Sequence, residues 1–307
     1  MKKLLTIALL LSATLAQAAT KFATRTYELT NFTEIVVNNS VKIIYTQGEP
    51  YSVKLTGRAD WLDLMKVSTT ADVLNVIVTK PKKFNNVKKK DMPDGQHIFI
   101  LHLTAPCLQK VDLRGFCSFE AKSMTPDRFN AELNGASTMQ IDKIDTPRFY
   151  VTLKGASTFK GKQIKCDEFV GASLLGASQA SINSATAPKS DFSISGASKF
   201  NLTQLKGGED AGVVIYGASE ATVNVEASKK MQIALSGASK GKLTYKGGKL
   251  FTGCTGASKL DADVSCTDIQ AKCDGASKIT FSGTADKVEI DRGGVATNID
   301  TSRLNQF

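Results

Sequence analysis

Six cysteines have the widest chemical range in this chain, because a thiol can form a disulfide, bind a metal or act as a nucleophile. They are Cys107, Cys117, Cys166, Cys254, Cys266 and Cys273. Their spacings lack the paired CxxC pattern that is typical of zinc sites. The only histidines, His97 and His102, are five residues apart, so in one strand they point to opposite faces and cannot share a metal. The sequence therefore predicts no metal site and no cofactor.

A polysaccharide-cleaving enzyme would need clustered carboxylates for proton transfer or calcium binding. The best candidates are Asp261 and Asp263, which alternate and would share one outward face of a strand. One sequence repeat later the same positions hold Thr280 and Ser282, so the acids do not continue into a cluster. A polysaccharide lyase or hydrolase is the alternative interpretation, and we predict no catalytic residue.

Lysines gather in two places of a chain whose formal net charge is +10. One group lies in segment 80–90, which we expect to be a long exposed loop, and comprises Lys82, Lys83, Lys88, Lys89 and Lys90. The other group comprises Lys199, Lys240, Lys259 and Lys278, each three residues after a recurring glycine. Either group could bind an anionic partner, and the alternative is a solvated surface without a ligand.

The recurring glycine belongs to the tripeptide Gly-Ala-Ser, which returns every 19 to 21 residues. Its copies begin at Gly135, Gly155, Gly176, Gly196, Gly217, Gly237, Gly256 and Gly275. Residues two before, four after and six after each glycine are mostly apolar, and those between them are almost all polar. Alternation with a period of two predicts strands with one buried face.

A copy of about 20 residues cannot bury its own apolar face, so the copies must stack, with equivalent strands about 4.8 Å apart. No copy has the apolar spacing of a helix, which excludes a helical repeat. The sequence thus predicts an all-β fold, a parallel β-solenoid. Glycine would form the corner of each coil, and the serines of successive corners could form a structural hydrogen-bonded row.

The repeat places Cys254 and Cys273 at the same inward position of adjacent coils. Their separation of about 4.8 Å would suit a disulfide, which makes this pair our candidate bridge. Two small buried thiols that only fill the core are the alternative.

The first residues have the pattern of a secretory signal peptide, with Lys2 and Lys3 before an apolar run and Ala16-Gln17-Ala18 at the cleavage position. We predict a signal peptide at 1–18, irregular β coils and a cap at 19–113, regular solenoid repeats at 114–294 and a C-terminal cap at 295–307. The predicted location is the periplasm or cell envelope of a Gram-negative-type bacterium, including its surface or the medium, without a transmembrane segment.

Several segments resemble the head GIN domain family, a group of exported bacterial proteins labelled putative auto-transporter adhesins. They are FTEIVV at 32–37, VKIIYTQG at 41–48, LHLTAP at 101–106, VDLRG at 111–115 and the Gly-Ala-Ser copies. The resemblance covers nearly all of the chain after residue 18. It implies a right-handed single-stranded parallel β-helix with coils of about 20 residues, and it implies little about activity.

Together these patterns predict a non-enzymatic module of the cell envelope, either adhesin-like or structural. Its rigid surface would meet an anionic glycan, an anionic lipid surface or another protein. Nucleic acid is not expected, because an exported protein rarely meets it.

Overall fold

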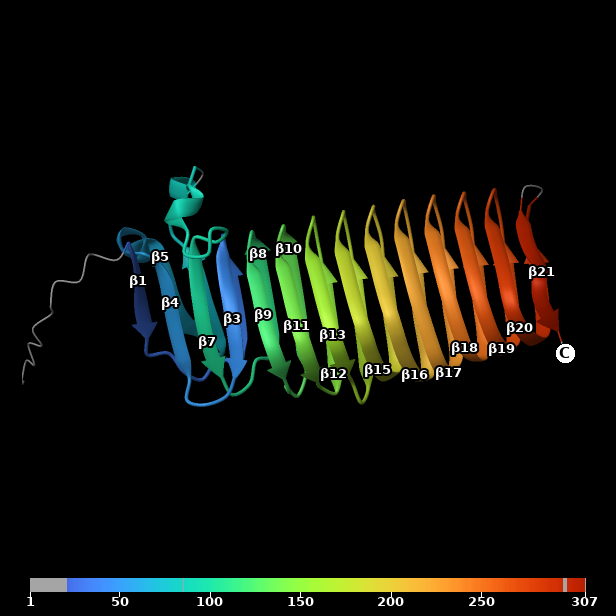
Figure 1. Ribbon diagram of the computed structural model, residues 1–307, viewed down its shortest axis with the longest axis horizontal. Helices are drawn as coiled ribbons and strands as arrows, with labels where there is room; N and C mark the ends of the chain where they lie inside the picture. The colour runs from blue at the N-terminus through green and yellow to red at the C-terminus, as the bar shows by residue number, and fades with distance from the viewer. Residues whose placement is uncertain (1–20, 85, 295–296, 307) are drawn as a thin grey trace, which may run out of the picture.

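The computed structural model describes residues 21–84, 86–294 and 297–306. The protein is nearly all β, with 69% strand and 4% helix, and its strands stack into an elongated β-solenoid of about 10 coils (Figure 1). This confirms the predicted fold class, whereas the right-handed sense of the coil stays a prediction. The predicted signal segment 1–18 lies outside the described residues.

Each coil contributes one strand to each of two parallel ladders. We call the ladder that leads to the corner glycine the A face, and the ladder that leaves the corner the B face. On the A face, β8 (Lys110–Gly115), β10 (Phe129–Gly135), β12 (Arg148–Leu153) and β14 (Phe169–Leu174) pair in order. On the B face, β9 (Ser118–Met124), β11 (Thr138–Asp145) and β13 (Thr158–Lys165) pair in order.

Later coils are single long strands that follow the B face, bend once and return along the A face. They are β15 (Gln179–Ile194), β16 (Lys199–Ile215), β17 (Glu220–Leu235), β18 (Lys240–Cys254), β19 (Lys259–Cys273) and β20 (Lys278–Arg292). The last strand, β21 (Asn298–Gln306), pairs in parallel with β20 and so continues the stack within segment 295–307.

The core lies between the two ladders, where the predicted inward positions are buried. Leu153 and Phe159 of one coil, for example, are both fully buried. Aromatic rings also meet across the two faces, since the ring centroids of Phe192 and Phe200 are 4.8 Å apart. The alternation in the sequence therefore corresponds to the inward and outward sides of each strand.

The Gly-Ala-Ser tripeptide forms the sharp corner of each coil. Each corner glycine has a positive φ, for example +73° at Gly217, a conformation that other residues reach only with strain. The next alanine donates its N–H to the glycine carbonyl of the preceding corner, as Ala218 does to Gly196 over 2.8 Å. The serines are buried. Ser198 Oγ donates to the Ser195 carbonyl of its own coil at 2.8 Å and to the Gly176 carbonyl of the preceding corner at 3.3 Å. The serine row is thus structural, as predicted.

The N-terminal part contains one regular coil, which stacks on the solenoid, and further strands that depart from the solenoid pattern. The regular coil is β2 (Glu34–Asn38) and β3 (Val41–Gln47), which pair with β8 and β9; Asn39 occupies its corner at φ +65°. Next to them, β6 (Val73–Val78) and β7 (Phe99–Ala105) add in parallel.

Antiparallel strands complete the cap at this end of the stack. They are β1 (Phe22–Tyr27), β4 (Ser52–Arg58) and β5 (Met65–Thr70). The sequence did not indicate β1 or β5, and it gave no sign of the antiparallel pairing. Three short 3-10 helices, η1 (Ala59–Leu64), η2 (Pro81–Phe84) and η3 (Lys89–Asp91), join the strands of the cap. Trp61 lies in η1 and is buried.

Replacing a corner glycine should destabilise the stack. A Cβ at Gly217 would lie 2.6 Å from the Gly196 carbonyl oxygen, and the φ of +73° would be strained. We expect Gly217→Ala to lower the free energy of unfolding by about 2–4 kcal/mol in urea titrations. The matched control is Gly253→Ala, because a Cβ there has no atom within 4 Å. Equal stability of the two variants would contradict the proposed role of the corner.

Buried thiols should make the fold sensitive to alkali. Burial raises the pKa of Cys166 and Cys254 to about 12 and that of Cys266 to about 11, so these thiols must stay neutral in the fold. Their stabilising contribution is complete below pH 9, the ordinary thiol pKa, and is lost as the pH rises toward 12. In reducing buffer we expect the free energy of unfolding to fall across this range. The combined variant Cys166→Ala, Cys254→Ala, Cys266→Ala should show a shallower fall; parallel profiles would refute this explanation.

Candidate functional site

The four lysines predicted as an anion-binding face do lie in one row on the B face. Strand pairing places Lys199 beside Glu220, Glu220 beside Lys240, Lys240 beside Lys259, and Lys259 beside Lys278. Neighbouring positions in this row are thus separated by the strand spacing of about 4.8 Å. The row is therefore a geometric feature of the surface, and its role as a binding site stays a prediction.

Acidic neighbours neutralise much of this row. Glu220 lies 3.9 Å from the amine of Lys199 and 3.8 Å from that of Lys240. Lys259 forms a 3.1 Å ion pair with Asp261 on its own strand. These side chains are about half exposed or more, so the pairs are weak, but they lower the net positive charge that an anion would meet.

The exposed pair of Lys259 and Asp261 should contribute little to stability. We expect Lys259→Gln to change the free energy of unfolding by less than about 0.5 kcal/mol, because solvent screens both charges. Urea titration at low salt measures this. A loss above about 1 kcal/mol would mean that the aliphatic part of Lys259 packs on the strand.

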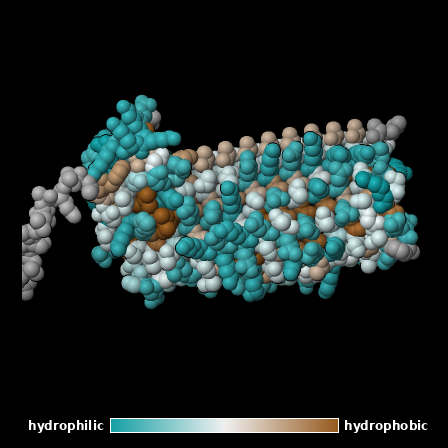
Figure 2. All heavy atoms as spheres, viewed as in Figure 1, coloured by the Kyte–Doolittle hydropathy of each residue, from teal (hydrophilic) through white to brown (hydrophobic). Residues whose placement is uncertain are grey.

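The predicted basic loop projects from the solenoid near the N-terminal end, as Figure 1 shows above the cap strands. On the side seen in Figure 2, the surface of this projection is mostly hydrophilic. The five lysines Lys82, Lys83, Lys88, Lys89 and Lys90 are all exposed. Among the described residues, none of these five amines forms an ion pair, in contrast to most of the B-face row.

Aromatic contacts fix the loop to the cap. The ring of Phe84 at the end of η2 packs edge-on against Trp61, with centroids 5.2 Å apart, and against Phe99 of β7 at 5.9 Å. The only tryptophan of the chain is thus part of the loop's support. The sequence gives no sign of this contact, because it joins residues far apart in the chain.

A hollow of about 470 Å³ lies between the loop and the cap. Lysines 82, 83, 88 and 90 line it, together with Arg58, Trp61, Asn86, Val87 and Asp91. The Arg58 guanidinium lies over the Trp61 ring at 4.4 Å and binds Asp60 at 2.7 Å and Asp91 at 3.1 Å. Ion pairs with Lys21 and Arg58 hold the pKa of the Asp91 carboxyl below its usual range, so it stays ionised. The arginine is therefore already neutralised, and the lysines are the cations open to a ligand.

The acids considered for an enzyme do not come together. Asp261 and Asp263 share the outward side of β19. On the adjacent strands, Asp261 lies beside Lys242 and Thr280. Asp263 lies beside Thr244 and Ser282. Asp261 is paired with Lys259, and Asp263 accepts a hydrogen bond from Ser282 at 3.1 Å. Neither acid meets a second acid on an adjacent strand.

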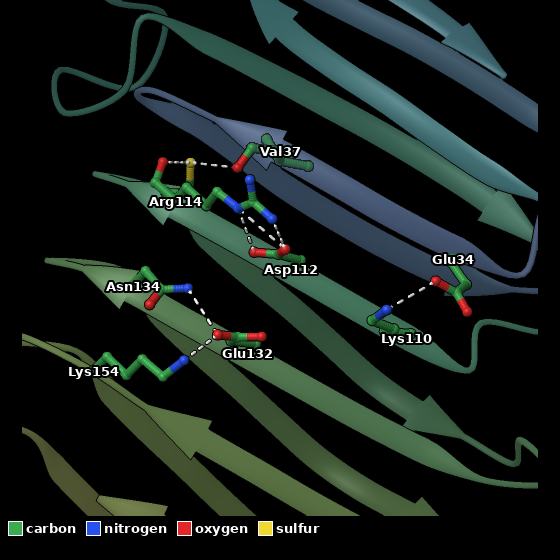
Figure 3. Close-up of polar contacts among 9 residues, drawn as sticks. Glu34, Val37, Lys110, Asp112, Arg114, Glu132, Asn134 and Lys154 are labelled. Carbon is green, nitrogen blue, oxygen red and sulfur yellow. Dashed lines mark hydrogen bonds and ion pairs between the residues drawn. The ribbon is translucent and has the colours of Figure 1, made fainter. Parts of the chain in front are cut away.

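Two other carboxylates do lie side by side, on the A face, and sequence analysis missed them. Figure 3 shows Asp112 and Glu132 on adjacent strands, each facing its own cation. Asp112 binds Arg114, and Glu132 binds Lys154 and Asn134. The hydrogen bond from Lys154 lowers the pKa of Glu132, so this group remains ionised rather than serving as a proton donor. The ion pair of Glu132 with Lys154 therefore joins neighbouring coils, whereas Asp112 and Arg114 belong to the same strand.

The cysteines and histidines offer no centre for metal chemistry. Strand pairing places Cys254 beside Cys273, both fully buried free thiols, and a disulfide between them stays a prediction. His97 was expected in a strand, but it precedes β7, where its ring lies 2.8 Å from Asp94. Within the described ranges, no three His, Cys, Asp or Glu side chains gather as metal ligands.

The fold and its surfaces define a β-solenoid protein whose exposed cations lie on a loop and on outward rows. The chain belongs to the family described as "Putative auto-transporter adhesin, head GIN domain", whose model matches residues 31–249. This confirms the family resemblance of the sequence. Curated proteins yield no match.

Two solved structures of similar proteins come from Parabacteroides. A putative adhesin from Parabacteroides merdae is 15% identical, with a TM-score of 0.53, and the match covers 92% of this chain and 97% of the other. A putative lipid binding protein from Parabacteroides distasonis is 14% identical, with a TM-score of 0.41, covering 92% and 97%. The first of these similarities supports the fold. In the part of this chain that the structure describes, no helix is long and apolar enough to span a bilayer.

Proposed function

We propose that this protein is a non-enzymatic, adhesin-like binding module of the cell envelope that docks on anionic surfaces through its basic loop. The observation that carries the proposal is the set of unpaired lysines around the hollow beside Trp61. Amines without an ion-pair partner among the described residues give this projecting loop a positive potential, and an anionic surface can approach the loop.

The relatives' descriptions support this proposal. The family is described as adhesins, which act at surfaces, and one structural neighbour is called a lipid binding protein. An exported or surface location follows from the same description and agrees with the signal sequence predicted at 1–18. The anionic groups would be phosphates or carboxylates of envelope lipids or glycans, which lysine binds as a point charge.

Two sets of four charge reversals test the proposal against the alternative lysine row. The loop variant carries Lys82→Glu, Lys83→Glu, Lys88→Glu and Lys90→Glu. The matched row variant carries Lys199→Glu, Lys240→Glu, Lys259→Glu and Lys278→Glu, with the same change in net charge. Binding to vesicles with and without anionic phosphatidylglycerol is measured by co-sedimentation at low and moderate salt.

We expect salt-sensitive binding to the anionic vesicles, weakened at least about tenfold in the loop variant, since each lysine near such a surface contributes roughly 1 kcal/mol. The row variant should lose less than about threefold. Greater loss in the row variant would move the site to the B face. Shortening of any envelope glycan incubated with the protein would overturn the non-enzymatic assignment.

A further inference from the structure

A groove of about 340 Å³ crosses four coils of the B face, and no residue of the basic loop lines it. Its lining consists of three consecutive residues from each of β13, β15, β16 and β17, namely 158–160, 179–181, 199–201 and 220–222. These triplets pair in register, so the groove runs along the solenoid axis, across the strands. Figure 2 looks onto this face, where polar side chains form rows with apolar surface visible between them.

The walls of the groove are mostly uncharged hydrogen-bonding groups. Gln179, Ser181 and Thr222 make no side-chain hydrogen bond to any other described residue, so their donors and acceptors are directed to solvent. Asn201 makes only a long contact of 3.5 Å with Thr203. The residues between the walls, Phe159, Ala180, Phe200 and Ala221, are buried in the core, so the floor of the groove is formed by the strands themselves. Such a surface matches a ligand with many hydroxyls.

The repeat distance favours one class of occupant. Equivalent wall groups recur at the coil spacing of about 4.8 Å, which is close to the length of one pyranose ring in an extended polysaccharide. Each sugar unit would therefore meet the same kind of hydroxyl or amide group. An added peptide strand would need a free sheet edge, and the strands that line the groove are paired on both sides in the middle of the stack. A flat lipid surface would not fill a narrow groove between two rows.

The charges around the groove favour an acidic polysaccharide. Lys160 and Lys199 stand on opposite walls, and the rows continue on the next coil with Lys240 and Lys242. The one acid in the lining, Glu220, lies between Lys199 and Lys240 at 3.9 and 3.8 Å and is neutralised by them. The net charge that a ligand meets is therefore positive.

We propose that this groove binds an extended, uronate-bearing polysaccharide strand that lies along the solenoid axis. Hydroxyl and amide groups of the walls bind the sugar hydroxyls, and the lysines bind the carboxylates. This binding does not involve the basic loop, so binding at the groove and binding at the loop can be tested separately.

The test uses oligomers of galacturonate, mannuronate and hyaluronan from two to eight sugars long, measured by calorimetry at moderate salt. Binding should tighten with length until four to six sugars fill the four coils, and then level off. The same oligomers with carboxylates reduced to alcohols should bind at least about tenfold more weakly. Absence of binding by all three series, or equal binding of the neutral oligomers, would overturn the proposal.

Two tyrosine substitutions on one strand locate the site. Ser181→Tyr places a ring into the groove and should weaken the best oligomer at least about tenfold. Ser193→Tyr is the matched control, because Ser193 belongs to the same strand β15 but pairs on the A face. Its affinity should stay within about twofold of the wild type. Melting curves establish that both variants fold, and equal affinity of the two variants would overturn the assignment.

The loop variant separates this inference from the proposed function. It should retain wild-type affinity for the oligomers but lose binding to the anionic vesicles. If it loses the oligomers as well and Ser181→Tyr retains them, the sugar binds at the loop and the groove assignment is wrong.

Discussion

The close contact between successive corner glycines is the constraint on which the rest of this structure depends. Each glycine adopts a left-handed conformation, and its carbonyl oxygen accepts the N–H of the alanine one coil later. A side chain at this position would collide with the carbonyl of the preceding corner. Because the corners stack without room for adjustment, every strand that leaves a corner starts in the same register, and the serine beside it is always buried.

Register converts sequence spacing into surface chemistry. Residues at equivalent places in successive copies lie beside each other. A residue type that recurs about every 20 residues in the sequence therefore forms a continuous row on the surface. The B face holds two examples, which form the two walls of the groove. One row places Glu220 between Lys199 and Lys240, and the other consists of Lys160, Ser181, Asn201 and Thr222. The A face carries the neighbouring acids Asp112 and Glu132, each paired with its own cation. Different chemistry on the two faces therefore needs no change in the backbone.

Sequence reasoning worked where the repeat operates and failed where it stops. The inward residues, the corners and the lysine row follow from period and spacing alone. The antiparallel strands β1 and β5 belong to no repeat, and their pairing depends on partners far along the chain. The hollow beside Trp61 depends likewise on contacts of Phe84 with two distant rings. The groove was missed for another reason: each residue in it is ordinary, and only the side-chain sizes on four neighbouring coils together leave the space.

The stacking of coils also determines how the molecule responds to force. The ladder hydrogen bonds run along the long axis, and each regular coil is bonded only to the coil before it and the coil after it. Tension between the two ends of the stack therefore loads the coils in series, and the weakest terminal coil detaches first. Each detached coil of about 20 residues adds roughly 70 Å of extended chain. A solenoid of this kind lengthens in steps under load and dissipates work at each one, so its attachment would yield gradually instead of breaking at once.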